Sequence, residues 1–164
     1  MRTPASIAGH PIHPMIVPIA IGGLILSFVF DIVCLVTGQA TPWSTVAYYT
    51  MIGGIVGAVA AAVFGLADLA SLPAGHAKRI GLVHMVINLL VVALFICNVW
   101  MRHARPDAAP GGAPLLLSLF GVLLLAISGW LGGKLVFEAG VGVSGEAEPT
   151  TSAAPRRPQA TRYS

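Results

Sequence analysis

Charged residues are scarce in this sequence. Asp, Glu, Lys and Arg make up only 9 % of the 164 residues, whereas about a quarter of the residues in a typical soluble domain are charged. Hydrophobic residues reach 56 % and gather in four runs, each long enough to cross the roughly 30 Å hydrocarbon core of a bilayer as a helix. The predicted spans are residues 15–36, 46–71, 80–101 and 115–137. A soluble chain of this length could not bury four such helices, so we predict an all-α, four-helix transmembrane bundle.

Motifs of soluble enzymes and of common metal centres are also missing. The sequence has no Gly-x-x-x-x-Gly-Lys phosphate loop, no Gly-x-Ser-x-Gly nucleophile elbow and no His-Glu-x-x-His zinc motif. Its two cysteines, Cys34 and Cys97, form no Cys-x-x-Cys pair, which excludes a zinc knuckle and a covalently attached c-type haem. They are expected at similar depth, either as apolar thiols inside the bundle or as a disulfide on an oxidising outer face. We expect no stand-alone catalytic activity and assign no catalytic residue.

The connections between the runs are short and rich in Gly and Pro. They cover residues 37–45, 72–79 and 102–114. Short links join antiparallel neighbours, which predicts an up-down-up-down arrangement. From residue 144 the sequence turns to Pro, Ala, Thr, Glu and Arg without an apolar period, so residues 1–143 are predicted as the membrane domain and 144–164 as a disordered tail. No internal repeat is evident.

The basic residues are distributed unequally between the two predicted faces. If the chain starts in the cytoplasm, only Arg102 and Arg105 of the nine basic residues face outward. The others are Arg2, Lys78, Arg79, Lys134, Arg156, Arg157 and Arg162. Under the positive-inside rule this bias predicts that both termini are cytoplasmic. Because the basic residues mark membrane boundaries and the tail, we expect no nucleic-acid partner.

Small residues recur on two of the spans and predict close helix packing. In lipid, helices associate through close backbone approach rather than through a hydrophobic drive. The small residues are Gly53, Gly57, Ala61 and Gly65 in the second span, and Gly121, Gly129 and Gly133 in the fourth.

Polar groups inside the spans are expected to face the bundle interior and to be paired. The third span carries them on one narrow stripe: His84, Asn88, Val91, Phe95, Asn98 and Arg102. From their depth we expect a hydrogen bond between Asp31 and Asn98. By the same reasoning we expect an ion pair between Asp68 and Lys134.

Two histidines stand immediately before the first span, and each is followed by proline. A residue before proline favours an extended conformation, so His10 and His13 are predicted to project from one face, about 9 Å apart. Pro14 suits the first turn of a helix. His84 enters the third span from the same side, which brings three imidazoles to one level of the membrane. The alternative interpretation is that these histidines only cap helix ends or lie in the membrane interface in contact with solvent.

Several motifs in this order resemble a known family. They are Gly9–Pro14 with Pro18 and Asp31, Gly65 with Asp68, His84 with Asn88, and the glycine-rich segments 129–133 and 140–143. Over residues 8–143 the chain resembles the bacterial membrane family of domain of unknown function 2231. The resemblance implies a four-helix domain of the bacterial inner membrane without an established activity. Similar proteins are sometimes joined to Rieske iron–sulfur or c-type cytochrome domains, which implies a redox partner and a link to respiratory electron transfer.

Three hypotheses follow for the function. In the first, the chain is a redox subunit that binds b-type haem through His13 and His84, with His10 as the alternative to His13. Asp68 and Asn88 would then orient the ligating rings. In the second, His10, His13 and His84 bind a metal ion or relay protons in a small transporter-like protein. In the third, the polar groups only fix helix register in a membrane assembly subunit, for which a homo-oligomer is one arrangement.

Overall fold

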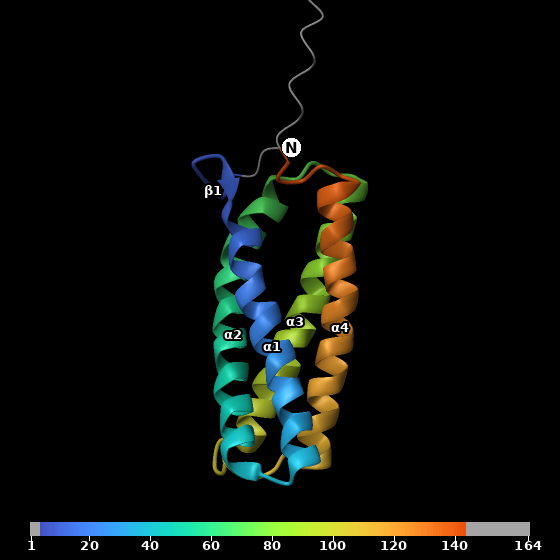
Figure 1. The fold of residues 1–164 in the computed structure, drawn as a ribbon. Coiled ribbons are helices and arrows are strands. Elements are labelled where there is room, and N and C mark those ends of the chain that lie inside the picture. The colour runs from blue at the N-terminus through green and yellow to red at the C-terminus, as the bar shows by residue number, and fades with distance from the viewer. Residues whose placement is uncertain (1–3, 144–164) are drawn as a thin grey trace, which may run out of the picture.

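The computed structural model describes residues 4–143, which form an antiparallel bundle of four helices (Figure 1). The helices are α1 (Ile12–Thr37), α2 (Ala40–Ser71), α3 (His76–Arg102) and α4 (Gly112–Phe137). Each is long and apolar enough to cross a membrane. The four predicted spans and their order are therefore confirmed, and the helices extend a few residues beyond the apolar runs. The predicted disordered tail lies outside the described residues.

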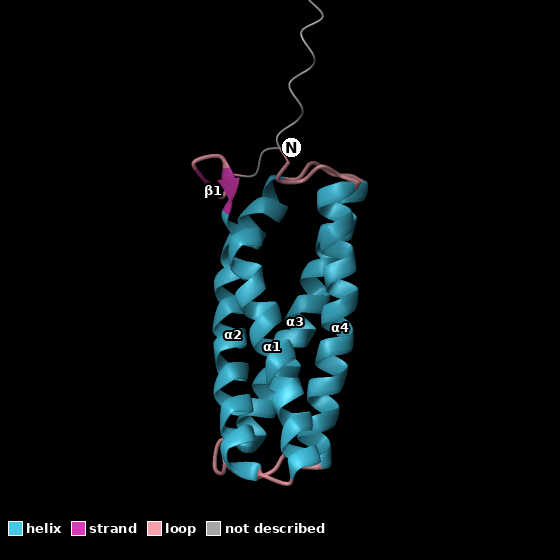
Figure 2. Cartoon of the chain, in the orientation of Figure 1, coloured by secondary structure: helices cyan, strands magenta, loops and turns pink. Residues whose placement is uncertain are grey.

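A small hairpin precedes the first helix. Strand β1 (Ser6–Ile7) pairs with β2 (His10–Pro11) in antiparallel register, and both strands are short (Figure 2). The two turn residues, Ala8 and Gly9, have φ angles of 49° and 82°, as the type I′ turn of a tight hairpin requires. This turn replaces the extended segment predicted for residues 10–14. His10 belongs to the hairpin and His13 to the first turn of α1, so the two rings do not share one extended face.

The helices pack as two hairpins, α1 with α2 and α3 with α4. In the first hairpin the backbones almost touch, because a Cβ added at Gly23 would lie 2.6 Å from Cα of Gly54. In the second, a Cβ at Gly121 would lie 2.6 Å from Cε2 of Phe95. The predicted packing role of small residues is confirmed at Gly57, which lies against Ile19 and Ala20, and at Gly121. By contrast, nothing lies within 4 Å of a Cβ added at three of the predicted positions: Gly53, Gly129 and Gly133.

The second hairpin repeats several contacts of the first, although the sequence shows no evident internal repeat. Leu24 lies against Gly54 in the first hairpin, as Phe95 lies against Gly121 in the second. The hairpins contact each other more weakly, through α1 with α4 and through α2 with α3. A half-turn about the bundle axis that places α1 on α3 and α2 on α4 would exchange these two interfaces. Equivalent positions are Leu24 and Phe95, Asp31 and Arg102, Gly54 and Gly121, Ala61 and Ser128. Parallel repeats of this kind are one of the ways in which membrane proteins are built.

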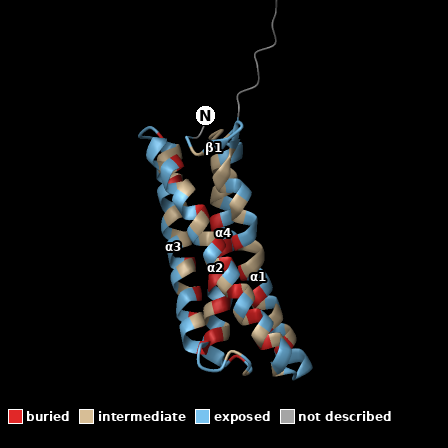
Figure 3. Cartoon of the chain, turned by 90° about the vertical axis from the view of Figure 1, so that its left-hand side faces the viewer, coloured by how far each residue is buried: buried red, intermediate tan, exposed pale blue. Residues whose placement is uncertain are grey.

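The bundle has two different ends with an apolar core between them. The histidine end holds His13, His84, the β-hairpin and both ends of the described chain; the arginine end holds Asp31, Arg102 and the loops after α1 and α3 (Figure 1). Between them lies a core of five buried apolar side chains: Leu24, Met51, Val91, Phe95 and Leu125. Figure 3 shows that buried residues are most frequent along the middle of the bundle and that the outer faces are largely exposed. Exposed apolar faces are what lipid contact requires.

Candidate functional site

His13 is held against the second helix. The ring is half-buried, and its Nδ1 lies 2.8 Å from the carbonyl oxygen of Ala61 on α2. One turn along α2, Gly65 makes room for the ring, because a Cβ added there would lie 2.9 Å from Nδ1 of His13. Both the orientation and the position of this imidazole are therefore fixed by α2.

His84 is held in the same way against the fourth helix. Its Nδ1 lies 2.9 Å from the carbonyl oxygen of Ser128 on α4, and a Cβ added at Gly132 would lie 3.3 Å from Cε1 of the ring. His84 follows His13 by the same 71 residues that separate Arg102 from Asp31. The two histidines are thus equivalent residues of the two hairpins.

The two equivalent rings are neighbours across the hairpin interface, in an edge-on arrangement. Their centres are 6.5 Å apart and their planes are inclined by 84°. A carbonyl oxygen only accepts hydrogen bonds, so Nδ1 of each ring carries a proton and donates it to Ala61 or Ser128. In the neutral rings Nε2 then keeps a free lone pair. Among residues 4–143, neither Nε2 has a hydrogen-bond partner.

Asn88 and Ser128 support His84 from the side. Asn88 donates from Nδ2 to the Ser128 hydroxyl, over 2.6 Å, and to the His84 carbonyl, over 2.8 Å. The Ser128 hydroxyl also lies 3.0 Å from Nδ1 of His84. The stripe predicted on α3 faces the interior, since its four residues beyond Asn88 are buried: Val91, Phe95, Asn98 and Arg102. Asn88 therefore acts on His84 through Ser128, as a residue that orients a ligating ring would.

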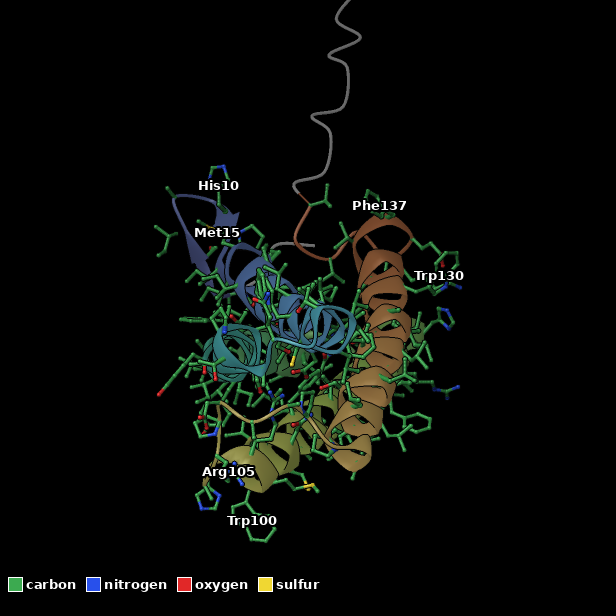
Figure 4. All side chains as sticks on the ribbon, turned by 60° about the horizontal axis from the view of Figure 1, so that its bottom comes forward. His10, Met15, Trp100, Arg105, Trp130 and Phe137 are labelled. Carbon is green, nitrogen blue, oxygen red and sulfur yellow. The ribbon has the colours of Figure 1, made fainter. Side chains whose placement is uncertain are left out.

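His10 and Asp68 lie elsewhere at the histidine end. The ring of His10 is exposed and points away from the helices (Figure 4), and its Nδ1 contacts the carbonyl of Ala8 in its own turn. Asp68 is buried and accepts a hydrogen bond from the backbone N–H of Ala5, over 3.3 Å. This bond fastens the β-hairpin to the end of α2. Within the described part of the chain, no group of three or more His, Cys, Asp or Glu side chains is placed to hold a metal ion.

Lys134 pairs with a different carboxylate from the one predicted. Its Nζ lies 3.7 Å from Oε2 of Glu138, one turn along α4, and both side chains are at least partly exposed. The predicted ion pair with Asp68 is therefore wrong. Asp68 faces the N-terminal hairpin instead, because the β-hairpin covers the end of α2. An exposed pair such as Lys134 with Glu138 contributes little to stability.

At the arginine end, Asp31 also has a different partner from the one predicted. Its Oδ2 accepts a hydrogen bond from Nη1 of Arg102, over 2.9 Å, and both side chains are buried. Asn98 donates instead to the carbonyl of Pro114 and to the hydroxyl of Ser118. The predicted hydrogen bond between Asp31 and Asn98 is therefore wrong. The partner of Asp31 is Arg102, which lies one turn of α3 after Asn98 and points inward. Cys34 is buried and Cys97 exposed, and both thiols are free.

The sequence reasoning missed the residues that hold the rings. Ala61 and Ser128 act through backbone carbonyls. Every residue has a backbone carbonyl, so the residue type does not reveal which ones accept from the rings. Gly65 and Gly132 could have been found as glycines at equivalent places in two glycine-rich spans. No motif or spacing in the sequence indicated a role for the Ser128 hydroxyl.

Comparison with known proteins adds a family match. A family model described as "Predicted membrane protein (DUF2231)" matches residues 9–145. This range includes both neighbouring histidines and all four helices. No curated protein and no solved structure matches the chain.

Proposed function

Because this chain belongs to the family of predicted membrane proteins called domain of unknown function 2231, whose name states no activity, we propose a function from its geometry: a membrane redox subunit that holds a b-type haem between His13 and His84. The observation that carries the proposal is the neighbouring pair of imidazoles, each oriented through Nδ1 and each with Nε2 free. Nδ1–H donation to a carbonyl is the usual support of a metal-ligating histidine.

The distance between the rings suits a shared metal ion. An imidazole nitrogen lies about 2.0–2.1 Å from a metal that it binds, so two rings on opposite sides of one ion have centres up to about 6.5 Å apart. The observed 6.5 Å is at this limit. Two opposed axial imidazoles are a common ligand set of b-type haem, whose iron supplies one-electron chemistry.

The number of ligands favours haem over a free metal ion. A bare Zn²⁺ ion takes three or four protein ligands, and in residues 4–143 only two imidazoles converge here. A haem brings its own four equatorial nitrogens and needs only the axial pair. The observation therefore supports the first hypothesis over the metal-handling one.

Two glycines seat the rings of the proposed site against their neighbouring helices. Gly65 and Gly132 leave no side chain where a Cβ would collide with the rings, so each imidazole can be seated deep against its neighbouring helix. The fully buried core residues lie beyond this level, toward the middle of the bundle. The chain's own residues would fix the orientation of the ligating rings through the Nδ1 hydrogen bonds, and such hydrogen bonds tune a haem potential. A Rieske or c-type cytochrome protein would be the electron partner, and the bacterial inner membrane the location.

An optical spectrum of the full chain tests the proposal. The protein is purified in detergent from cells supplied with a haem precursor, and reduced-minus-oxidised spectra are recorded. We expect a Soret band and about one haem per chain by the pyridine haemochrome assay, as a bis-imidazole site requires. His13→Ala and His84→Ala should each abolish the band, whereas His10→Ala, on the exposed hairpin, should keep it. Circular dichroism shows whether each variant remains helical.

Each other outcome points to a different function. A colourless wild-type protein with stoichiometric metal would support the metal-handling hypothesis. A colourless protein without metal would leave the structural role. A Soret band that survives His84→Ala would place a haem elsewhere and contradict the site.

A further inference from the structure

The arginine end contains a polar cluster that is buried as completely as the apolar core. Asp31, Asn98 and Ser44 have exposed fractions of 0 %, and Arg102 of 5 %. Arg102 donates from Nη1 to Asp31 and from Nη2 to the hydroxyl of Ser44, over 2.9 Å in each case. One guanidinium thus joins α1, α2 and α3 in the interior of the bundle.

Three buried atoms at this end of the bundle have no partner among the described residues. They are Oδ1 of Asp31, Oδ1 of Asn98 and Nε of Arg102. Each is fully buried, and a buried polar atom without a hydrogen bond costs roughly 1–3 kcal/mol or more. Native proteins satisfy such atoms with bound water when protein groups do not reach them.

We propose that this cluster binds one water molecule, which donates to Asp31 and Asn98 and accepts from Arg102. The numbers of donors and acceptors agree: the two oxygens need two donated protons, Nε–H needs one acceptor, and a water molecule supplies both. Three hydrogen bonds is also the usual number for a buried water. A metal cation fits less well, because the Arg102 guanidinium would repel it.

A cavity at the membrane surface provides the way in. It has a volume of about 240 Å³ and is lined by Arg102, Arg105 and the loop residues Ala108–Gly111. Arg102 belongs both to the lining and to the cluster, so this residue lies between the cavity and the buried polar atoms. Buried water sites need only the space of one molecule beyond such an entrance.

The apolar core closes this path toward the histidine end. Leu24, Met51 and Phe95 have exposed fractions of 1 % or less and lie between the two ends. Water therefore enters the bundle from the arginine end without reaching His13 and His84. This inference concerns other residues than the proposed haem site and does not depend on it.

An experimental structure of the full chain at about 2 Å or better tests the inference directly. We expect a water peak within hydrogen-bonding distance, about 2.7–3.2 Å, of all three atoms. No peak at this position, or direct protein partners for Asp31 Oδ1 and Asn98 Oδ1, would overturn it.

A double-mutant cycle tests the same site in solution. Asp31→Asn and Asn98→Leu are made singly and together, and the thermal unfolding midpoint is measured in detergent. If one water molecule joins the two side chains, either single substitution already disrupts the water site. The decrease in the unfolding midpoint of the double variant should then be smaller than the sum of the decreases in the two single variants. Additive losses would contradict the shared water.

Asn88→Leu on the same helix is the matched control. Asn88 belongs to the histidine end and touches no residue of the cluster in the described contacts. Combined with Asp31→Asn, its effect should be additive. If Asp31→Asn does not fold, the structure of the unchanged protein decides.

Discussion

At the scale of single residues, the glycine beneath each imidazole sets how closely that ring approaches its neighbouring helix. Gly65→Ala would bring a methyl group 2.9 Å from Nδ1 of His13, whereas Gly132→Ala would bring one 3.3 Å from Cε1 of His84. We expect Gly65→Ala to lower the free energy of unfolding by about 1–3 kcal/mol, as overpacking does, and to weaken the Soret band. Gly132→Ala should have a smaller effect on both, because a shift of a few tenths of an ångström relieves the contact.

Gly133→Ala is the control for both substitutions, since nothing lies within 4 Å of a Cβ added there. It should change the unfolding free energy by no more than roughly 0.5 kcal/mol, as at other open positions. Thermal unfolding in detergent and absorbance per chain measure the series. Equal effects of all three alanines would show that the glycines do not seat the rings.

Ser128 contributes to the same site through its hydroxyl. Ser128→Ala keeps the backbone carbonyl that accepts from His84 but removes the hydroxyl next to Nδ1 and its bond from Asn88. We expect the free energy of unfolding to fall by about 0.6 kcal/mol, the mean contribution of such hydrogen bonds in membrane proteins. The Soret band should be retained. The reduction potential should rise, because a less supported ring donates less electron density to iron. A redox titration measures this shift, and a lost band would show that the hydroxyl is required for binding.

At the scale of helices, the Asp31–Arg102 pair is a buried ion pair that joins the two hairpins. Arg102→Leu leaves the buried Asp31 carboxylate without its cation, which costs about 3–5 kcal/mol in comparable cases. Replacing both residues by Leu removes both charges, so the double variant should be more stable than Arg102→Leu. Unfolding in detergent measures the series. A double variant as unstable as the sum of its single variants would contradict the ion pair as the cause.

The helices could be predicted from the sequence much better than their polar contacts. A helix rises by about 1.5 Å per residue, so the position of a residue in a span gives its depth, and this placed His13 and His84 at one level. How each helix is rotated toward its neighbours depends on packing, which single residue positions do not reveal. The sequence therefore predicted Asn98 as the partner of Asp31, although Arg102, on the same stripe, reaches it.

The repeat was hidden for a related reason. Equivalent positions of the two hairpins carry residues of different size or opposite charge, such as Leu24 and Phe95 or Asp31 and Arg102. What the hairpins share is mostly geometry: a ring against a glycine and an Nδ1–H donated to a carbonyl. Few equivalent helix residues are identical, among them His13 and His84, Gly65 and Gly132, and Ile16 and Ile87, and so few identities do not mark a repeat in an apolar sequence.

At the scale of the whole molecule, the two ends of the bundle must face opposite sides of the membrane. The chain enters at the histidine end and α4 ends there as well (Figure 1). Lys78, Arg79 and Lys134 lie at this end, whereas Arg102 and Arg105 lie at the other. A surplus of basic residues on one side sets the orientation of short-looped membrane proteins, so we expect the histidine end to face the cytoplasm.

Two reporter fusions measure this orientation. Green fluorescent protein joined after residue 164 should fluoresce, because it folds in the cytoplasm. Alkaline phosphatase joined after residue 106, in the loop that follows α3, should be active, because it needs the oxidising exterior. Phosphatase activity at the C-terminus together with none after residue 106 would invert the bundle. The pocket beside Arg102 would then open to the cytoplasm, and an electron partner of the histidine pair would have to approach from outside.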